Sequence, residues 1–422
     1  MAGILLKNIT LNGSQRDISI CGGIISKISD AGSSAGDSPE SEVIDCTGKA
    51  AFPGFVNMHT HAGMSLMRGM QEDVPFQEWI NNIWDIEAKL DADFVYWSSK
   101  VSVIEMIKTG TTTYNDQYWF APWSRKAALE LGITPAVSYV IIDRGNPDEV
   151  PRQIDQCQRM YERSKIWPGD APFCISFHAI YSVSEPLIVW ASEFANKNNL
   201  NLHIHLSETR KEMEDCMAAH GGLSPVEYLD RLGVLGPHLI AAHSLWLSEN
   251  DIRLLGENKV NCVHNINSNL KLSSGYKFKY QELKEAGANV CIGTDGCASS
   301  NNLDMLEAMK TSALLQKAWR NDPKAMPLEE LAAAATVNGA KALRLNTGVI
   351  EEGKRADILI VDTDNTYFLS PGSFLANFVY SAHSDCIESV IAGGKFVMRN
   401  REIPGEKEIL QKARGIIRQI MN

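Results

Sequence analysis

The chain has no run of about 18 consecutive apolar residues, no CxxC pair and no excess of basic residues. Without a long apolar run there is no candidate for a membrane-spanning helix. The nine cysteines are scattered singly, and their odd number is typical of a reduced protein rather than a disulfide framework. The opening MAGILLKNITLNG lacks the long apolar core of a signal peptide. We therefore expect a cytoplasmic protein that does not act at a membrane.

The charge balance excludes a further class of function. The formal net charge is -11, and no basic stripe or patch is visible along the chain. A surface that binds nucleic acid would need such a patch to neutralise phosphates. With 44% hydrophobic and 22% charged residues, the composition is that of an ordinary globular protein. We expect a small-molecule ligand and no nucleic-acid partner.

Short strand-like runs occupy both ends of the chain. ILLKNITL and ISICGGIISKI precede the loop-like DAGSSAGDSPESE, and TGVIEEGKRADILIVDTD and CIESVIAGGKFVMRN repeat the pattern near the other end. Segments at opposite ends of a chain are well placed to pair, since the termini of domains often lie close together. We expect them to form a small β unit from residues 1–54 and 347–422, the latter ending in a helix over EKEILQKARGIIRQIMN.

The middle of the chain alternates eight short apolar or β-branched runs with longer segments of helical period. The runs are FVNMH, TTTYND, TPAVSYVII, FCISFHA, NLHIHLSE, LIAAHS, VNCVHN and NVCIGTD. Continuous apolar strands separated by helices indicate a parallel sheet covered on its outer face. Eight such units are what a closed (β/α)8 TIM barrel needs, and we expect it to occupy residues 55–346.

Metal-type or acid–base residues stand at the ends of six of these runs, although the chain has only 10 histidines. They are His59, His61, His178, His205, Glu208, His243, His264 and Asp295. Singly, each could be an ordinary polar residue of a core or rim. As a set they fall where barrel chemistry is located, at the carboxyl ends of the strands.

The residue types in this set point to a metal centre. Imidazoles and a carboxylate suit Zn²⁺ or Fe²⁺. Side chains alternate along a strand, so His59 and His61 point to one face and could bind one ion together. His205 and Asp295 would complete the coordination from across the barrel. The absence of cysteine among these residues argues against a structural zinc site.

Several motifs together resemble the amidohydrolase superfamily, in particular its aminohydrolase branch. These are PGFVNMHTH, His205 followed by Glu208, IAAHS at His243, and GTDGCASSNN at Asp295. AGMSLMRGMQEDVPFQEW, WDIEAKL and VHNINSNLKLSSG are most similar to the deaminases of 5'-methylthioadenosine and S-adenosylhomocysteine. The resemblance covers essentially the whole chain, and it implies that the terminal β unit is that family's small β-sandwich.

The resemblance implies a one-metal site and a division of catalytic roles. His59, His61, His205 and Asp295 correspond to the ligands, with Zn²⁺ favoured and Fe²⁺ the alternative, because His178 stands where two-metal members carry a lysine. His243 would hydrogen-bond the attacking water. Asp295 would accept a proton from that water, and Glu208 would protonate the ring nitrogen beside the attacked carbon. Ammonia then leaves, and an adenine ring becomes hypoxanthine.

The resemblance also implies substrate contacts. Glu87 matches the glutamate that binds both ribose hydroxyls, His178 the histidine that contacts the purine, and Trp79 and Met64 supply apolar walls. Taken alone, Glu87 has the alternative of being an exposed helix residue, and a Trp or Met such as Trp79 or Met64 is more often a core residue. His203 shares a strand face with His205, and we expect it to be structural.

The residues that would bind the group attached to the ribose do not decide which adenosine derivative is the substrate. Arg152 matches one of two arginines that bind the carboxylate of a homocysteine tail, but Tyr139 stands at the other place, with Arg144 displaced. Methylthioadenosine, S-adenosylhomocysteine, adenosine and 5'-deoxyadenosine all remain candidates.

The sequence leaves three alternative functions open. They are a triazine-type chloro- or aminohydrolase, a deaminase of guanine, cytosine or a pterin, and a non-catalytic barrel protein. All expected ligands are present, which disfavours the last. The loop MSLMRGMQEDVPFQEW could cap the pocket or meet a neighbouring subunit in a homo-oligomer.

Overall fold

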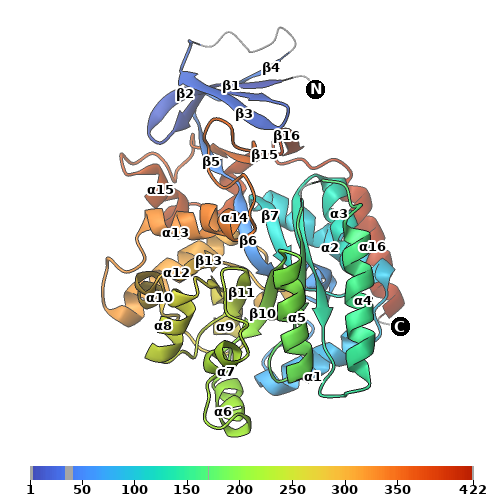
Figure 1. Cartoon of the computed structure of the whole chain (residues 1–422). Coiled ribbons are helices and arrows are strands. Elements are labelled where there is room, and N and C mark those ends of the chain that lie inside the picture. Colours follow the sequence, from blue (N-terminus) through green and yellow to red (C-terminus); the bar gives the residue numbers. More distant parts are fainter. Residues whose placement is uncertain (1–2, 34–40, 170, 421–422) are drawn as a thin grey trace.

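All eight apolar runs of the middle region form parallel strands of one sheet in the computed structural model, which describes residues 3–33, 41–169 and 171–420. The strands pair in chain order, and helices lie around them (Figure 1). They are β6 (Phe55–Thr60), β7 (Thr111–Asp116), β8 (Thr134–Ile141), β9 (Phe173–Phe177), β10 (Asn201–Leu206), β11 (Leu239–His243), β12 (Asn261–His264) and β13 (Asn289–Ile292). The predicted (β/α)8 barrel is confirmed.

The barrel closes where the first strand, β6, meets the last, β13. Asn57 on β6 donates from Nδ2 to the Thr294 hydroxyl at 2.7 Å, and its Oδ1 accepts the Thr294 backbone N–H at 3.1 Å. The backbone N–H of Asp295 donates to the carbonyl of His59 at 2.9 Å. These bonds bring the two ends of the barrel sequence together at the rim.

Helices surround the barrel, both on its outside and at the end where the strands terminate. They are a 3-10 helix (Ala62–Met67), α1 (Phe76–Glu87), α2 (Ala92–Lys108), α3 (Ala121–Leu131), α4 (Glu149–Ser164), α5 (Glu185–Lys197), α6 (Arg210–Ala219), α7 (Pro225–Arg231), α8 (Glu249–Glu257), α9 (Ile266–Lys271), α10 (Tyr280–Ala286), α11 (Cys297–Ser300), α12 (Met305–Arg320), α13 (Leu328–Ala335) and α14 (Val337–Ala342). Local signals set several ends. Asp91 caps α2 by accepting the Phe94 N–H, and Gly132 ends α3 with a φ of 88°.

The two ends of the chain share a second sheet, which lies above the barrel in Figure 1. Its strands are β1 (Ile4–Leu11), β2 (Ser14–Cys21), β3 (Ile24–Asp30), β4 (Glu42–Asp45), β5 (Lys49–Pro53), β14 (Ile358–Asp362), β15 (Ile387–Ala392) and β16 (Lys395–Met398). β5 pairs antiparallel with β14, so Phe52 stands opposite Leu359. The predicted pairing of the terminal segments is confirmed. Part of the expected loop DAGSSAGDSPESE, residues 34–40, lies outside the described residues.

The C-terminal segment returns to the barrel after this sheet. It contains α15 (Phe374–Ala376), a π-helix (Asn377–Ser381), a 3-10 helix (Ser384–Cys386) and α16 (Glu406–Ile420). α16 lies beside α2 (Figure 1), and Lys108 Nζ is 2.7 Å from Glu406 Oε1. The division into 1–54, 55–346 and 347–422 stays a proposal. β5 ends at Pro53 and β6 begins at Phe55, which supports the first boundary.

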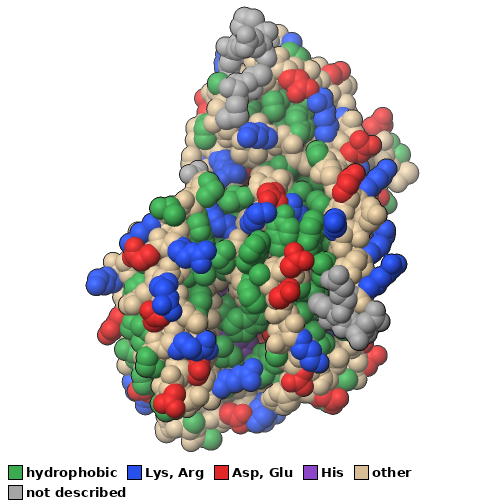
Figure 2. Space-filling model, turned by 90° about the vertical axis from the view of Figure 1, so that its right-hand side faces the viewer, with side chains coloured by type: hydrophobic (Ala, Val, Ile, Leu, Met, Phe, Trp, Pro, Cys, Tyr) green, Lys and Arg blue, Asp and Glu red, His purple; other side chains and the backbone are tan. Residues whose placement is uncertain are grey.

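The surface mixes side chains of all kinds. On the face that Figure 2 shows, acidic and basic side chains are interspersed among hydrophobic ones. Among the described residues, every helix is too short or too polar to cross a membrane. Eight of the nine cysteines are buried, and Cys21 is exposed.

Gly110, just before β7, packs against the terminal sheet and provides a stability test. Its φ is +92°, and a Cβ there would lie 2.8 Å from Leu359 Cδ1 and 2.9 Å from Ile387 Cδ1. We expect Gly110→Ala to lower the free energy of unfolding by about 2–4 kcal/mol, because left-handed strain adds to overpacking. Denaturant unfolding measures the loss.

Gly233→Ala is the matched control. Gly233 also has a left-handed φ of +70°, but nothing lies within 4 Å of the place that a Cβ would occupy. It should lose only the backbone part, about 1–2 kcal/mol. Equal losses in the two variants would show that the contact between barrel and sheet is not tightly packed at Gly110.

Candidate active site

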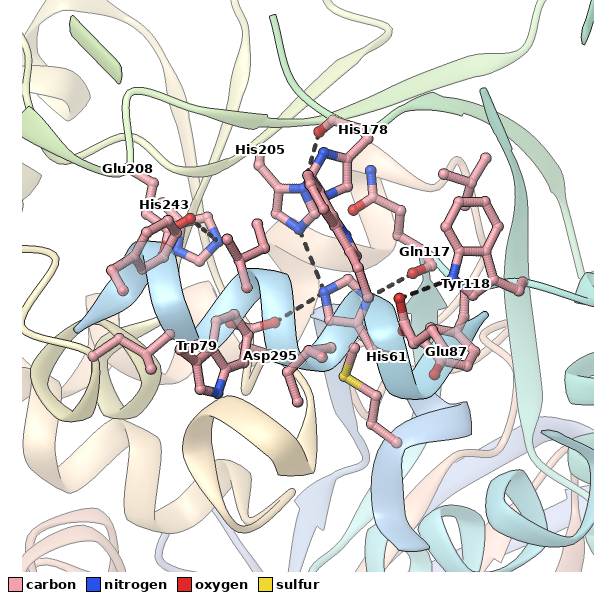
Figure 3. A pocket seen from close by; sticks show the side chains of 18 of the residues that line it. His61, Trp79, Glu87, Gln117, Tyr118, His178, His205, Glu208, His243 and Asp295 are labelled. Atoms are coloured by element: carbon pink, nitrogen blue, oxygen red, sulfur yellow. Dashed lines mark hydrogen bonds and ion pairs between the residues drawn. The ribbon is translucent and has the colours of Figure 1, made fainter. Parts of the chain in front are cut away.

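Four predicted ligand side chains converge at the carboxyl end of the barrel. His59 lies near the end of β6, His61 follows that strand, His205 lies near the end of β10, and Asp295 follows β13. Asp295 Oδ1 is 3.2 Å from His59 Nε2 and 3.1 Å from His61 Nε2. His61 Nε2 is 3.3 Å from His205 Nε2 (Figure 3). The four side chains thus surround one small volume, as the sequence predicts.

Backbone carbonyls fix the protonation of two of these imidazoles. His61 Nδ1 lies 2.5 Å from the Gln117 carbonyl, and His205 Nδ1 lies 2.9 Å from the His178 carbonyl. A carbonyl only accepts, so each Nδ1 carries the hydrogen and donates it. When both rings are neutral, their Nε2 atoms present lone pairs to each other at 3.3 Å. A divalent cation between them fits this arrangement, because it replaces the repulsion of two lone pairs by two ligand bonds.

His59 completes the ligand-type set. Its Nε2 is buried without a hydrogen-bond partner among the described residues, and its Nδ1 lies 3.0 Å from His203 Nε2. Its geometry places it in two possible metal-binding groups, one with His61 and Asp295 and one with His205 and His243. An unpartnered buried nitrogen that faces a carboxylate is typical of a ligand position.

The proposed acid, Glu208, lies beside this cluster, and the proposed base, Asp295, is part of it. Glu208 is buried just after β10, and its Oε2 is 3.7 Å from His243 Nε2. Burial raises the pKa of Glu208 above its ordinary value, which favours the protonated form of its carboxyl group. Asp295 Oδ1 also accepts the backbone N–H of Gly296 at 2.9 Å, which orients its carboxylate.

Left-handed backbone occurs at three of these strand ends. φ is +51° at Ser207, +72° at His243 and +62° at Asp295. Each non-glycine residue in this region costs about 1–2 kcal/mol, so the surrounding structure must compensate. Strained backbone of this kind clusters at active sites, where it directs a side chain that a relaxed strand would aim elsewhere.

A cavity that opens to solvent lies above the cluster. It is lined by His61, Met64, Phe76, Trp79, Ile80, Ile83, Trp84, Glu87, Gln117, Tyr118, Trp119, Val140, His178, Tyr181, His205, Glu208, His243, Leu272 and Asp295. Aromatic and aliphatic walls therefore surround a polar floor (Figure 3).

Glu87 stands at the end of α1, across the pocket from Glu208 (Figure 3). Trp119 Nε1 donates to Glu87 Oε2 at 3.1 Å, and the Tyr118 hydroxyl also interacts with this carboxylate, while Oε1 is buried without a hydrogen bond of good geometry among the described residues. Burial raises the pKa of Glu87. A buried carboxylate oxygen without a donor is costly, so the pocket offers a place for a ligand hydroxyl there.

His178 lies between the cluster and the pocket wall. Its Nδ1 is 2.9 Å from the Ser182 hydroxyl, and its ring packs edge-on to His205 and Trp84. Burial lowers the pKa of His178 to about 3, so the ring is neutral at pH 7. A neutral ring presents one donor and one acceptor to a ligand.

The other predicted substrate contacts divide into two groups. Trp79 and Met64 are buried and line the pocket. Arg152 does not line it. It lies on α4, forms an ion pair with Glu149, and lines an adjacent cavity with Tyr139 and Arg144.

Two histidines of the strand ends lie outside the pocket. His203 is buried behind His59, and its Nδ1 lies 3.2 Å from Asn115 Nδ2. His264 is buried and stacks on Phe278 with ring centroids 4.2 Å apart. Their places are compatible with structural roles.

Three consecutive lining residues, Gln117, Tyr118 and Trp119, were not singled out from the sequence. They follow β7 directly, so the rule that barrel sites lie at the carboxyl ends of strands was a signal for them. Gln117 Oε1 is buried without a partner among the described residues.

Known proteins that are similar in sequence to this chain over most of its length include deaminases. Residues 50–397 match the model of the Amidohydrolase family. The chain is similar to a 5'-deoxyadenosine deaminase from Methanoregula boonei, with 42% identity over 88% of this chain and 85% of the relative. It is also similar to a 5-methylthioadenosine/S-adenosylhomocysteine deaminase from Archaeoglobus fulgidus, with 41% identity over 93% of both chains.

Solved structures share the architecture. An adenosine deaminase from Xanthomonas campestris with bound zinc superposes with a TM-score of 0.92 at 30% identity, over 100% of this chain and 98% of its own. An atrazine chlorohydrolase from Arthrobacter aurescens superposes with a TM-score of 0.89 at 22% identity, over 98% and 100% of the two chains, and shows the shared fold alone. The chain is an enzyme that belongs to the amidohydrolase family.

Proposed function

We propose that the chain catalyses the metal-dependent hydrolytic deamination of an adenosine derivative, yielding the inosine derivative and ammonia. One observation carries this proposal: a single pocket holds a ligand-type cluster and a buried Glu208 at one end and the unpartnered Glu87 oxygen at the other. The end with the cluster and Glu208 suits an aminated ring, and the end with Glu87 suits the hydroxyls of a ribose. The names of the similar proteins support the same reaction.

We propose that His59, His61, His205 and Asp295 hold one divalent ion, Zn²⁺ in preference to Fe²⁺. The donor set of three imidazoles and one carboxylate suits both ions, and the similar adenosine deaminase structure contains zinc. When bound, such an ion can lower the pKa of water from 15.7 to about 7 and so supply a nucleophile at neutral pH.

The chain's own residues then move the protons. Asp295 accepts a proton from the attacking water, and His243 hydrogen-bonds that water through Nε2. Glu208 gives its carboxyl proton to the ring nitrogen beside the attacked carbon, which makes the carbon more electrophilic. The water oxygen bonds to that carbon.

Ammonia leaves in the second half of the reaction. The proton on Asp295 passes to the amino nitrogen, the carbon–nitrogen bond breaks, and the remaining hydroxyl becomes the carbonyl. Its proton returns to Glu208, which restores the starting state of both carboxyl groups. Acid and base are thus separate residues in different environments, as the raised pKa of buried Glu208 favours.

Glu87 and His178 orient the substrate in this proposal. Oε1 of Glu87 accepts ribose hydroxyl hydrogens while Trp119 holds Oε2. His178, neutral in the pocket wall, contacts the purine edge, and Trp79 and Met64 form apolar walls.

The group attached to the ribose 5' carbon faces the side of the pocket nearest the adjacent cavity, which shares Tyr118, Trp119 and Val140 with it. Arg152 is already paired with Glu149, whereas the Arg144 guanidinium lies 4.5 Å from the Trp84 ring centroid. The pairing of Arg152 favours a small neutral 5' group, whereas Arg144 beside the pocket wall is a cation that a carboxylate-bearing tail would use.

A substrate panel tests the function. Zinc-loaded protein is incubated with 5'-deoxyadenosine, methylthioadenosine, adenosine, S-adenosylhomocysteine, guanine and cytosine, and ammonia and the ultraviolet change are recorded. We expect turnover of the adenosine derivatives, with a higher kcat/KM for those with small neutral 5' groups. Glu208→Gln, which keeps the shape but lacks an acidic proton, should lose at least about 100-fold. Activity confined to a ring other than adenine would contradict the proposal.

Glu87→Ala tests the ribose contact. Because one charged hydrogen bond is worth about 1.5–3 kcal/mol, KM for 5'-deoxyadenosine should rise about 10- to 100-fold. Turnover of free adenine, which has no hydroxyls, should stay unchanged. Glu78→Ala removes the same charge from an exposed position on α1 and should have no effect. An equal loss on adenine and on the riboside would show that Glu87 does not bind ribose.

His205→Ala tests the metal site without reference to activity. After zinc loading and dialysis, wild-type protein should retain one ion per chain, measured by plasma mass spectrometry, and the variant should retain at least about 10-fold less. Removing zinc by chelation should also lower the unfolding temperature, since a ligand that binds the native state stabilises it. His220→Ala, which removes a histidine stacked on Tyr228, is the control. Retention of a full ion by His205→Ala would remove His205 from the ligand set.

A further inference from the structure

The segment after β12 has no part in the proposed reaction, although its sequence, VHNINSNLKLSSG, is one of the motifs that distinguish the chain. It contains α9 and the turn that follows, residues 266–275. Only Leu272 of this segment lines the pocket. Ser268, Asn269 and Ser274 are buried and do not reach the substrate space.

Each of these three polar side chains forms a hydrogen bond with one proposed catalytic residue. The Ser268 hydroxyl donates to Asp295 Oδ2 at 2.6 Å. His243 Nδ1 lies 2.7 Å from Asn269 Oδ1 and donates to it, since an amide oxygen only accepts. The Ser274 hydroxyl donates to Glu208 Oε1 at 3.1 Å. One stretch of seven residues, Ser268–Ser274, thus contacts the base, the water-binding histidine and the acid.

These bonds determine which atoms remain available for the reaction. With Ser268 on Oδ2, Asp295 presents Oδ1 to His59 and His61. With hydrogen on Nδ1, His243 presents Nε2 as an acceptor. With Ser274 on Oε1, the acidic proton of Glu208 is directed to Oε2.

The segment itself is firmly held. The Ser274 backbone N–H donates to the Asn269 carbonyl at 3.0 Å, and Trp246 Nε1 donates to the Ser274 carbonyl at 2.7 Å. Lys271 Nζ lies 2.6 Å from Asn301 Oδ1 and 2.8 Å from Glu72 Oε2. The hydroxyls and the amide therefore stand on a fixed backbone on both sides of Lys271.

We propose that α9 and the following turn are a positioning element, in which Ser268, Asn269 and Ser274 orient Asp295, His243 and Glu208 and assign their protons. This inference rests on the proposed roles of those three catalytic groups. It predicts an effect on kcat and not on KM, because none of the three positioning side chains touches the pocket. Loss of an orienting hydrogen bond of this kind typically costs about 10- to 100-fold in activity.

The kinetic test uses Ser268→Ala, Asn269→Leu and Ser274→Ala, each zinc-loaded and assayed with the best substrate of the panel. We expect kcat to fall about 10- to 100-fold with KM within about twofold of wild type. Ser268→Thr, Asn269→Asp and Ser274→Thr keep the hydroxyl or the acceptor oxygen and should recover most of the loss. Bound zinc and unfolding temperature are measured for every variant, so that misfolding is separated from misalignment.

Two matched variants sharpen the comparison. Ser312→Ala removes an equally buried hydroxyl on α12 that has no partner among the described residues, and it should leave kcat unchanged. Leu272→Ala alters the pocket wall from within the same segment and should raise KM. Unchanged kcat in folded, zinc-containing Ser268→Ala and Ser274→Ala, or a rise in KM like that of Leu272→Ala, would overturn the inference.

A second readout separates this inference from the proposed function. In ¹⁵N-histidine spectra, the Nδ1–H of His243 should give a protected signal that disappears in Asn269→Leu and returns in Asn269→Asp. This holds whether or not any adenosine derivative is turned over. Wild-type protein that is inactive on the whole panel would contradict the function, whereas a His243 signal unchanged in Asn269→Leu would contradict the positioning role.

Discussion

The contact between the first and the last barrel strands determines whether a site exists. His59 and His61 come from β6 and the residues directly after it, and Asp295 follows β13. The bond from the Asp295 N–H to the His59 carbonyl and the paired bonds between Asn57 and Thr294 hold these two strand ends together. Every further feature of the cluster, including the facing Nε2 atoms of His61 and His205, requires that closure.

Sequence reasoning was strongest where periodicity and chain position decide the structure. The eight apolar runs predicted all eight barrel strands, and the strand-end rule brought His59, His61, His205 and Asp295 into one volume. The pairing of the terminal segments followed from their similar composition and from the tendency of termini to meet.

The positions of side chains on loops and turns were predicted less well from the sequence. Arg152 was placed by matching a family position, and in the structure its side chain is paired with Glu149 beside an adjacent cavity. Gln117, Tyr118 and Trp119 line the pocket from the loop that directly follows β7. The bonds of Ser268, Asn269 and Ser274 depend on left-handed and tightly turned backbone, which hydrophobic periodicity does not encode.

The pairing of β5 with β14 has a consequence for biosynthesis. Pro53 stands opposite Ile358, so β5 has no partner on that edge until most of the chain has left the ribosome. Contacts between residues so distant in sequence raise the contact order, which slows folding and leaves an unpaired strand edge open to aggregation in the meantime. β6, which carries His59, begins two residues after β5 ends. The catalytic centre needs Asp295 from beyond β13 and the terminal sheet needs β14, so both can be completed only after the late part of the chain has been synthesised.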